Sequence, residues 1–126
     1  EKAKPQAAAQ LDFSVVDRVD GVVLVRADGL KGGPLRDLSD RIRQQEQADG
    51  AIVASTDEGR AYLVVNFADA LVGKGLDAGA LIRDLGKHIG GGGGGKPTLA
   101  EAGGRNADGV DAALAAGRQA VEDALA

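Results

Sequence analysis

The chain has 126 residues, of which 44% are hydrophobic and 2% are aromatic, and this length is enough for one hydrophobic core, so we expect a single domain. The absence of cysteine excludes disulfides and thiolate zinc sites, the single histidine excludes a multi-histidine metal site, and three aromatic rings are too few for a base-stacking platform. The net charge of −4 excludes a broadly basic face, so any contact with nucleic acid must be local.

The first ten residues, EKAKPQAAAQ, show no apolar periodicity that would bury a face. We therefore predict a linker or the end of an upstream helix at 1–10, and a globular domain at 11–126. No apolar run approaches the 18 residues that a membrane span needs, so no membrane association is expected. Because the chain contains no methionine, we interpret it as a piece of a longer protein.

Two short runs rich in β-branched residues, at 13–16 and 22–25, are separated by Asp20-Gly21, a pattern that predicts paired strands. The next apolar residues are spaced as in a helix and predict one over 34–47. The opposite side of this helix carries charges of both signs, which favours a solvated face over a binding stripe. These charged residues are Arg36, Asp37, Asp40, Arg41 and Arg43.

Runs at 51–55 and 61–67 predict a second hairpin, in which Leu63, Val64 and Val65 indicate a strand buried on both faces. Asp77 is a suitable N-cap for a helix that ends near 89, and an alanine-rich segment at 108–125 predicts a closing helix. Strands interleaved with helices indicate an α/β (α+β) fold. We expect one compact domain with a mixed central sheet packed by helices, and a glycine-rich loop after the penultimate helix.

Six consecutive glycines follow that penultimate helix, and two interpretations of them stay open: Gly90, Gly91, Gly92, Gly93, Gly94 and Gly95. The run is either a flexible spacer or a backbone that closely approaches another backbone or a phosphate. The run and Lys96 fit part of a phosphate-binding loop, but Pro97 replaces the required Ser or Thr. A helix also precedes the glycines where that motif requires a strand, so we reject a nucleoside triphosphate loop.

Basic residues gather around the glycines. Arg83 and Lys87 are spaced i,i+4 on the predicted helix, and Lys96 and Arg105 lie beyond it. Together with the glycines they are the candidate nucleic-acid-binding residues; the alternative is that they only increase solubility and, for Arg83 and Lys87, offset the helix dipole. For His88 we expect the same capping role rather than catalysis.

The many carboxylates show no convergent pair, so no catalytic site is predicted in this chain. Glu101 is the one carboxylate in the glycine-rich segment. A salt bridge to Lys96 or Arg105 is the favoured interpretation of Glu101, and orientation of a group of a nucleic acid is the alternative.

The segment 89–104, IGGGGGGKPTLAEAGG, followed by an alanine-rich helix, resembles the C-terminal end of bacterial alanyl-tRNA synthetases. That pattern is a glycine cluster, a basic residue, proline, a short apolar stretch and Ala-Gly-Gly, and the likeness covers 11–126. The corresponding unit is the DHH-associated domain, which also closes the DHH phosphoesterases. Lys96-Pro97 favours the synthetase branch, whereas Gly92 stands where synthetases often carry a basic residue within the cluster.

The resemblance implies a tRNA-binding module that contacts the elbow of tRNA-Ala and helps to couple aminoacylation with editing. The parent would be a cytoplasmic, ATP-dependent alanine-tRNA ligase, with ATP, magnesium and zinc bound only elsewhere in it, and a homodimer would form through the parent chain. One alternative is the nucleic-acid- or nucleotide-binding half of a DHH phosphoesterase. A second alternative is an element of dimerisation or assembly.

Overall fold

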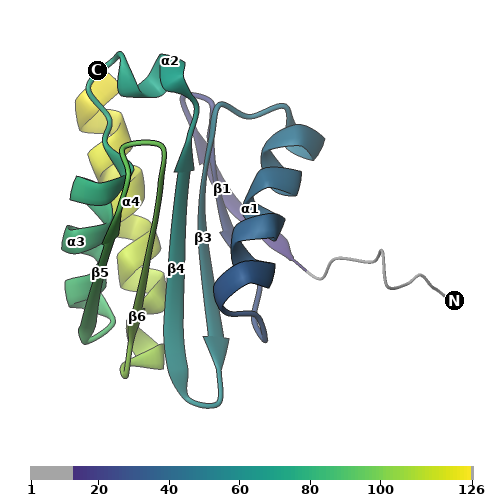
Figure 1. Cartoon of the computed structure of the whole chain (residues 1–126), viewed down its shortest axis with the longest axis vertical. Helices are drawn as coiled ribbons and strands as arrows, with labels where there is room; N and C mark the ends of the chain where they lie inside the picture. The colour runs from purple at the N-terminus through teal and green to yellow at the C-terminus, as the bar shows by residue number, and fades with distance from the viewer. Residues whose placement is uncertain (1–12, 126) are drawn as a thin grey trace, which may run out of the picture.

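A six-stranded mixed sheet lies between helix α1 on one face and helices α3 and α4 on the other (Figure 1). The computed structural model describes residues 13–125, so the predicted linker at 1–10 lies outside the described residues. The strands are β1 (Ser14–Val19), β2 (Val22–Arg26), β3 (Gly50–Asp57), β4 (Arg60–Phe67), β5 (Gly91–Gly95) and β6 (Leu99–Gly104). The helices are α1 (Gly32–Glu46), α2 (Asp69–Val72), α3 (Ala78–His88) and α4 (Val110–Leu125), and a 3₁₀ turn (Ala107–Gly109) precedes α4.

The sheet has the strand order β1-β2-β3-β4-β6-β5, so β1 and β5 are its edges. Both predicted hairpins, β1–β2 and β3–β4, are confirmed as antiparallel pairs. The pairing of β2 with β3 is parallel because α1 crosses over between them. The α+β class and the mixed sheet are therefore confirmed, while the short helix α2 and strands β5 and β6 were not predicted.

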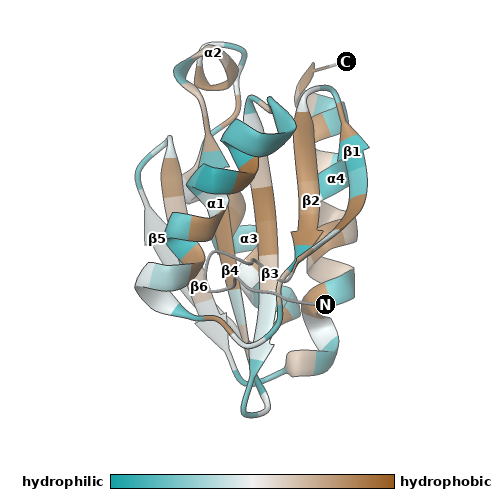
Figure 2. Ribbon diagram, turned by 90° about the vertical axis from the view of Figure 1, so that its right-hand side faces the viewer, coloured by the Kyte–Doolittle hydropathy of each residue, from teal (hydrophilic) through white to brown (hydrophobic). Residues whose placement is uncertain are grey.

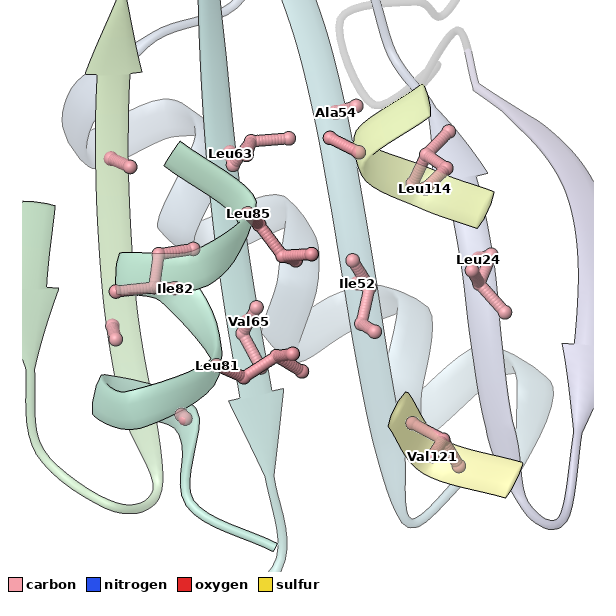
Figure 3. Close-up of a cluster of buried hydrophobic side chains, with 14 of the residues drawn as sticks. Leu24, Ile52, Ala54, Leu63, Val65, Leu81, Ile82, Leu85, Leu114 and Val121 are labelled. Atoms are coloured by element: carbon pink, nitrogen blue, oxygen red, sulfur yellow. The ribbon is translucent and has the colours of Figure 1, made fainter. Parts of the chain in front are cut away.

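Two hydrophobic layers hold the sheet to its helices. The larger layer fills the space between the sheet and helices α3 and α4, and Figure 3 shows its central side chains. A smaller layer lies under α1, where Leu35, Leu38 and Ile42 cover alternate residues of β2 and β3. In β4, Leu63 and Val65 belong to the larger layer and Val64 to the smaller one, which confirms a strand buried on both faces. The central strands β2 and β3 are accordingly the most continuously apolar part of the view in Figure 2.

Helix α3 begins as the sequence indicates, because the Asp77 side chain accepts a hydrogen bond from the Ala80 N–H at 3.0 Å. Its apolar residues Leu81, Ile82 and Leu85 are buried against the sheet. The helix ends at His88, so the chain turns at Gly90, where φ is +67°, and returns along the sheet as β5. The start and direction of β5 are thus set by the packing of α3.

The charged side of α1 is not simply a solvated face, and that prediction was wrong for part of it. Arg43 Nη1 donates to Asn66 Oδ1 at 3.0 Å, and Asn66 Nδ2 donates to Ser39 Oγ at 2.9 Å and to Asp40 Oδ1 at 2.7 Å. Asn66 is buried in β4, so its amide requires these partners. This network, together with an ion pair from Arg36, fixes the position of α1 across the sheet.

Asp28, just after β2, provides an acid-sensitive contact. Partial burial raises the pKa of Asp28, but hydrogen bonds from Arg26 and from the Thr56 N–H outweigh this effect, so its pKa is lowered. A carboxyl group with a lower pKa in the folded chain stabilises the fold above its unfolded pKa of about 3.9, and this stabilisation is lost as pH falls through the folded pKa.

Replacing Asp28 by Asn should therefore destabilise the chain at pH 7, and the difference from wild type should shrink as pH falls below about 4. Urea unfolding at pH 7 and pH 3 measures this difference. The control is Asp37→Asn, which removes the same charge from an exposed carboxyl that has no ion-pair partner among residues 13–125. A difference of the same size at both pH values would contradict the assignment.

Candidate nucleic-acid interface

The glycine run forms an edge strand, not the predicted loop. Gly91–Gly95 make up β5, which pairs antiparallel with β6 from Gly91↔Gly104 to Gly95↔Ala100. Strand propensity could not indicate this, because glycine is depleted in strands and carries no side chain to show a period of two. The spacer interpretation is therefore wrong within the described chain, and the close approach of backbones is the correct one.

Alternate glycines of β5 lie too close to β6 for any side chain. A Cβ added to Gly91 would lie 2.0 Å from the Gly103 carbonyl oxygen. A Cβ on Gly93 would lie 2.0 Å from the carbonyl oxygen of Glu101, and one on Gly95 would lie 2.4 Å from that of Leu99. Since these are backbone atoms, no rotation of a side chain relieves the contact, and the pairing of β5 with β6 requires glycine at these positions.

Helix α3 also meets β5 backbone to backbone. A Cβ on Gly86 would lie 3.0 Å from Gly92 Cα, and a Cβ on Gly79 would lie 3.0 Å from the Gly95 carbonyl oxygen. These two helix glycines are seven residues apart and so share one face of α3. The helix therefore lies directly on the glycine strand, as Figure 1 shows at the left edge of the sheet.

The four predicted basic residues follow this edge rather than surrounding one loop. Arg83 and Lys87 are exposed on α3, Lys96 follows β5 at the turn into β6, and Arg105 follows the other end of β6. Lys96 and Arg105 are thus separated by the length of a five-residue strand, roughly 16 Å. We call these four residues and β5 the basic edge.

Within the described part of the chain, three of the four side chains on the basic edge make no ion pair. Among the residues that the structure describes, Arg83, Lys96 and Arg105 have no carboxylate within 4.0 Å, and Lys87 Nζ is 3.8 Å from the exposed Asp84 Oδ1. The prediction that Glu101 pairs with Lys96 or Arg105 was wrong. Glu101 Oε2 instead accepts from Arg36 Nη1 at 2.6 Å, which leaves the cations of the basic edge available to a ligand.

The backbone of β5 adds polar groups to this surface. As an outer strand, β5 turns one row of N–H and C=O groups away from β6, and its five glycines place no side chain over them. His88 lies exposed in the last turn of α3, near the carbonyl ends that a cation stabilises, and its own carbonyl accepts from Asn106 Nδ2 at 3.3 Å. Bare backbone donors between separated cations are suited to an extended anionic chain.

Within residues 13–125, no three side chains of the types that bind metals come together. In the same part of the chain, no helix has both the length and the apolar character needed to cross a membrane.

The chain is similar in sequence to alanine-tRNA ligases of bacteria. The alanine-tRNA ligase of Pediococcus pentosaceus is 39% identical over 122 residues, which cover 95% of this chain and 14% of the relative. That of Dichelobacter nodosus is 44% identical over 110 residues, covering 86% of this chain and 12% of the relative. The chain thus spans only 12–14% of the length of these two relatives.

A solved structure agrees with the sequence comparison. The crystal structure of the C-Ala domain from Aquifex aeolicus alanyl-tRNA synthetase matches with a TM-score of 0.70 and 27% identity, covering 82% of this chain and 94% of that one. The family model of the DHHA1 domain matches residues 19–123. The chain therefore belongs to the DHHA1 domain family and is similar in sequence and fold to the C-Ala domain of alanyl-tRNA synthetase.

Proposed function

We propose that this domain is the tRNA-binding C-terminal module of a cytoplasmic alanine-tRNA ligase. Its place in the DHHA1 family and its likeness to alanine-tRNA ligases over 95% of the chain support this role. In this proposal the domain contacts the elbow of tRNA-Ala and helps the aminoacylation and editing modules to share one tRNA. The rest of the parent enzyme supplies ATP, magnesium and zinc binding and any homodimer contacts.

The observation that carries the proposal is the basic edge. Arg83, Lys96 and Arg105 are exposed, lack carboxylate partners among the described residues, and flank a strand without side chains in a chain of net charge −4. Phosphate groups form charge-assisted hydrogen bonds with such side chains, and a bare strand admits a ribose-phosphate backbone at short range. Because the chain has a net charge of −4, the rest of its surface repels the phosphates of RNA, so in this proposal RNA binds at this edge.

The synthetase role is favoured over a DHH phosphoesterase. The two relatives described above are named alanine-tRNA ligases and share 39% and 44% of their residues with this chain in the matched regions. Binding of tRNA by this chain, without turnover of small phosphodiesters, distinguishes the two roles. If the domain served only assembly and did not bind RNA, the sedimentation coefficient of this chain would be the same with and without tRNA, whereas binding of tRNA would raise it.

Single substitutions on the basic edge test the proposal. Lys96→Ala and Arg105→Ala should each weaken binding of a tRNA-Ala transcript by about 1–2 kcal/mol, because each removes a charge-assisted phosphate contact. Thermal stability should change little, since neither side chain has an ion-pair partner among residues 13–125. Titrations at one fixed salt concentration give the affinities, and thermal unfolding gives the stabilities.

The matched control is Lys74→Ala, which removes an exposed positive charge from the turn after α2, where Lys74 lines a pocket with Asp20 and Leu125. This variant should keep nearly the wild-type affinity. If Lys96→Ala and Arg105→Ala instead lowered the melting temperature by several degrees and left the affinity intact, the two residues would belong to the fold and the proposed interface would be wrong.

A further inference from the structure

Three glycines on or beside the basic edge, Gly92, Gly94 and Gly103, occupy positions where the described part of the fold does not require glycine. Within the described residues, a Cβ added to Gly92 or Gly94 would meet no atom within 4 Å, and a Cβ on Gly103 would make only an ordinary contact of 3.6 Å with Tyr62 Cδ1. None of the three has a positive φ. Their neighbours Gly91 and Gly93, in contrast, cannot accept a side chain at all.

A glycine inside a strand weakens it, because the unfolded chain gains freedom and no side chain packs. Gly92 and Gly103 are direct partners across β5 and β6, and Gly103 is also the partner of Tyr62 in β4. Two adjacent positions on one face of the sheet are thus bare, and no contact among residues 13–125 requires this. Without side chains, the sheet backbone is open at these positions to a close approach from outside.

A cavity of about 380 Å³ lies over these positions. Its floor is Gly92 and Gly103, with Tyr62 beside them, and Lys31, Gly32 and Glu101 also line it. It opens between the first turn of α1 and strands β6 and β5, and Figure 2 shows that turn in front of the two strands. The cavity therefore lies on the α1 side of the sheet and includes part of the basic edge.

The chemistry of the walls fits a planar, anionic group. Tyr62 is half-buried and offers a ring, and the bare peptide groups of β5 and β6 offer a flat surface. Lys31 Nζ is 3.7 Å from Asp57 Oδ2, at a contact exposed enough for the ammonium group to reach a phosphate. Glu101, held by Arg36, places a carboxylate at the wall that can accept from the N–H groups of a base.

We propose that this cavity holds one unstacked nucleotide of the bound RNA, with its base on the Gly92–Gly103 floor beside Tyr62 and its phosphate near Lys31. This inference rests on the proposed function, because an RNA strand that follows β5 passes the mouth of the cavity. It adds a base contact on the α1 side of the sheet to the phosphate contacts of the basic edge.

Blocking the floor tests the proposal. Gly92→Val and Gly103→Ala should weaken binding of the tRNA-Ala transcript at least tenfold, while the melting temperature stays the same or rises, since a Cβ at either position makes no contact with the described residues that is shorter than 3.6 Å. Gly73→Ala, a glycine with helical backbone angles at the end of α2, is the matched control and should bind like wild type. Lys31→Ala should bind more weakly than Lys74→Ala.

Tyr62 provides a direct readout, because it is the only tyrosine in the chain. With ¹³C-labelled tyrosine, the NMR signals of its ring should shift on addition of tRNA-Ala, and the shift should be lost in Gly92→Val. The cavity proposal would be overturned, and the proposed function kept, if the wild-type chain bound tRNA without a shift of the Tyr62 ring signals and Gly92→Val bound tRNA as tightly as the wild type. Failure of the wild-type chain to bind tRNA would overturn the proposed function and this inference together.

Titration with free mononucleotides distinguishes a nucleotide of bound RNA from a free nucleotide as the occupant of the cavity. Adenosine, guanosine, cytidine and uridine monophosphates should shift the ring signals only at concentrations far above those of tRNA, because they lack the contacts of the basic edge. If one of them bound as tightly as tRNA, the cavity would be a site for a free nucleotide and the RNA assignment would be wrong.

Discussion

Gly93→Ala is expected to destabilise the chain by about 3 kcal/mol or more, at the upper end of what overpacking costs. The added Cβ would lie 2.0 Å from the Glu101 carbonyl oxygen and 2.5 Å from Ala102 Cα, both of which are backbone atoms of β6. Relief requires β5 to move away from β6, which would break its pairing with that strand and its backbone contact with α3, where Gly86 lies against Gly92. Urea unfolding measures the loss.

The matched control for this prediction is the adjacent residue. Gly92→Ala introduces the same methyl group into the same strand, where no atom of residues 13–125 lies within 4 Å, and should leave the free energy of unfolding unchanged or slightly higher. The affinity of Gly93→Ala for tRNA is not informative unless the variant is folded at the temperature of the assay. Equal stability of the two variants would contradict the close backbone pairing of β5 with β6.

Phe67→Ala should lower the free energy of unfolding by about 3–5 kcal/mol. Phe67 is the largest of the fully buried side chains, with 1% of its surface exposed, and it ends β4. Its ring lies over Gly50, its direct partner in β3, where the absence of a side chain makes room for it. Truncation leaves a cavity that the neighbouring Leu71 fills only in part.

A double-mutant cycle tests this interpretation of Gly50. In the wild-type background, Gly50→Ala places a Cβ 2.8 Å from Phe67 Cδ1 and 2.9 Å from Leu71 Cδ1, and should cost about 1–3 kcal/mol. In the Phe67→Ala background the ring is gone, so the same substitution should cost at least about 1 kcal/mol less. Additive effects would mean that the ring and Gly50 are independent.

Much of the fold could be predicted because side-chain patterns carried the information. The alternating and continuous apolar runs in β2, β3 and β4 indicated strands, and the helical spacing of Leu81, Ile82 and Leu85 together with Asp77 indicated α3. Composition also excluded metal and disulfide chemistry that needs cysteine, and the glycine-rich segment and its neighbours indicated the family. In each case the signal lay in the types of residue and their spacing along the chain.

The sequence also predicted four basic residues for the candidate site, and the structure differs in how it arranges them. Arg83, Lys87, Lys96 and Arg105 were expected around one loop, whereas the structure spreads them along an edge strand. Glu101 was expected to pair with a neighbour in the sequence and pairs instead with Arg36, 65 residues away. Ion pairs between distant elements depend on the order of the strands in the sheet and on where the helices pack. The spacing of residues along the sequence does not indicate either.

The glycines mark most clearly what only the tertiary structure decided. Six identical residues carry no periodicity, so the sequence could not distinguish Gly91 and Gly93, which face the β6 backbone, from Gly92 and Gly94, where a Cβ would meet none of the residues that the structure describes. That difference arises from the register of β5 against β6 and from the approach of α3 through Gly79 and Gly86. Contacts between two backbones are not indicated by the pattern of side chains along the sequence. The structural role of each glycine is therefore determined only by how the strands pair.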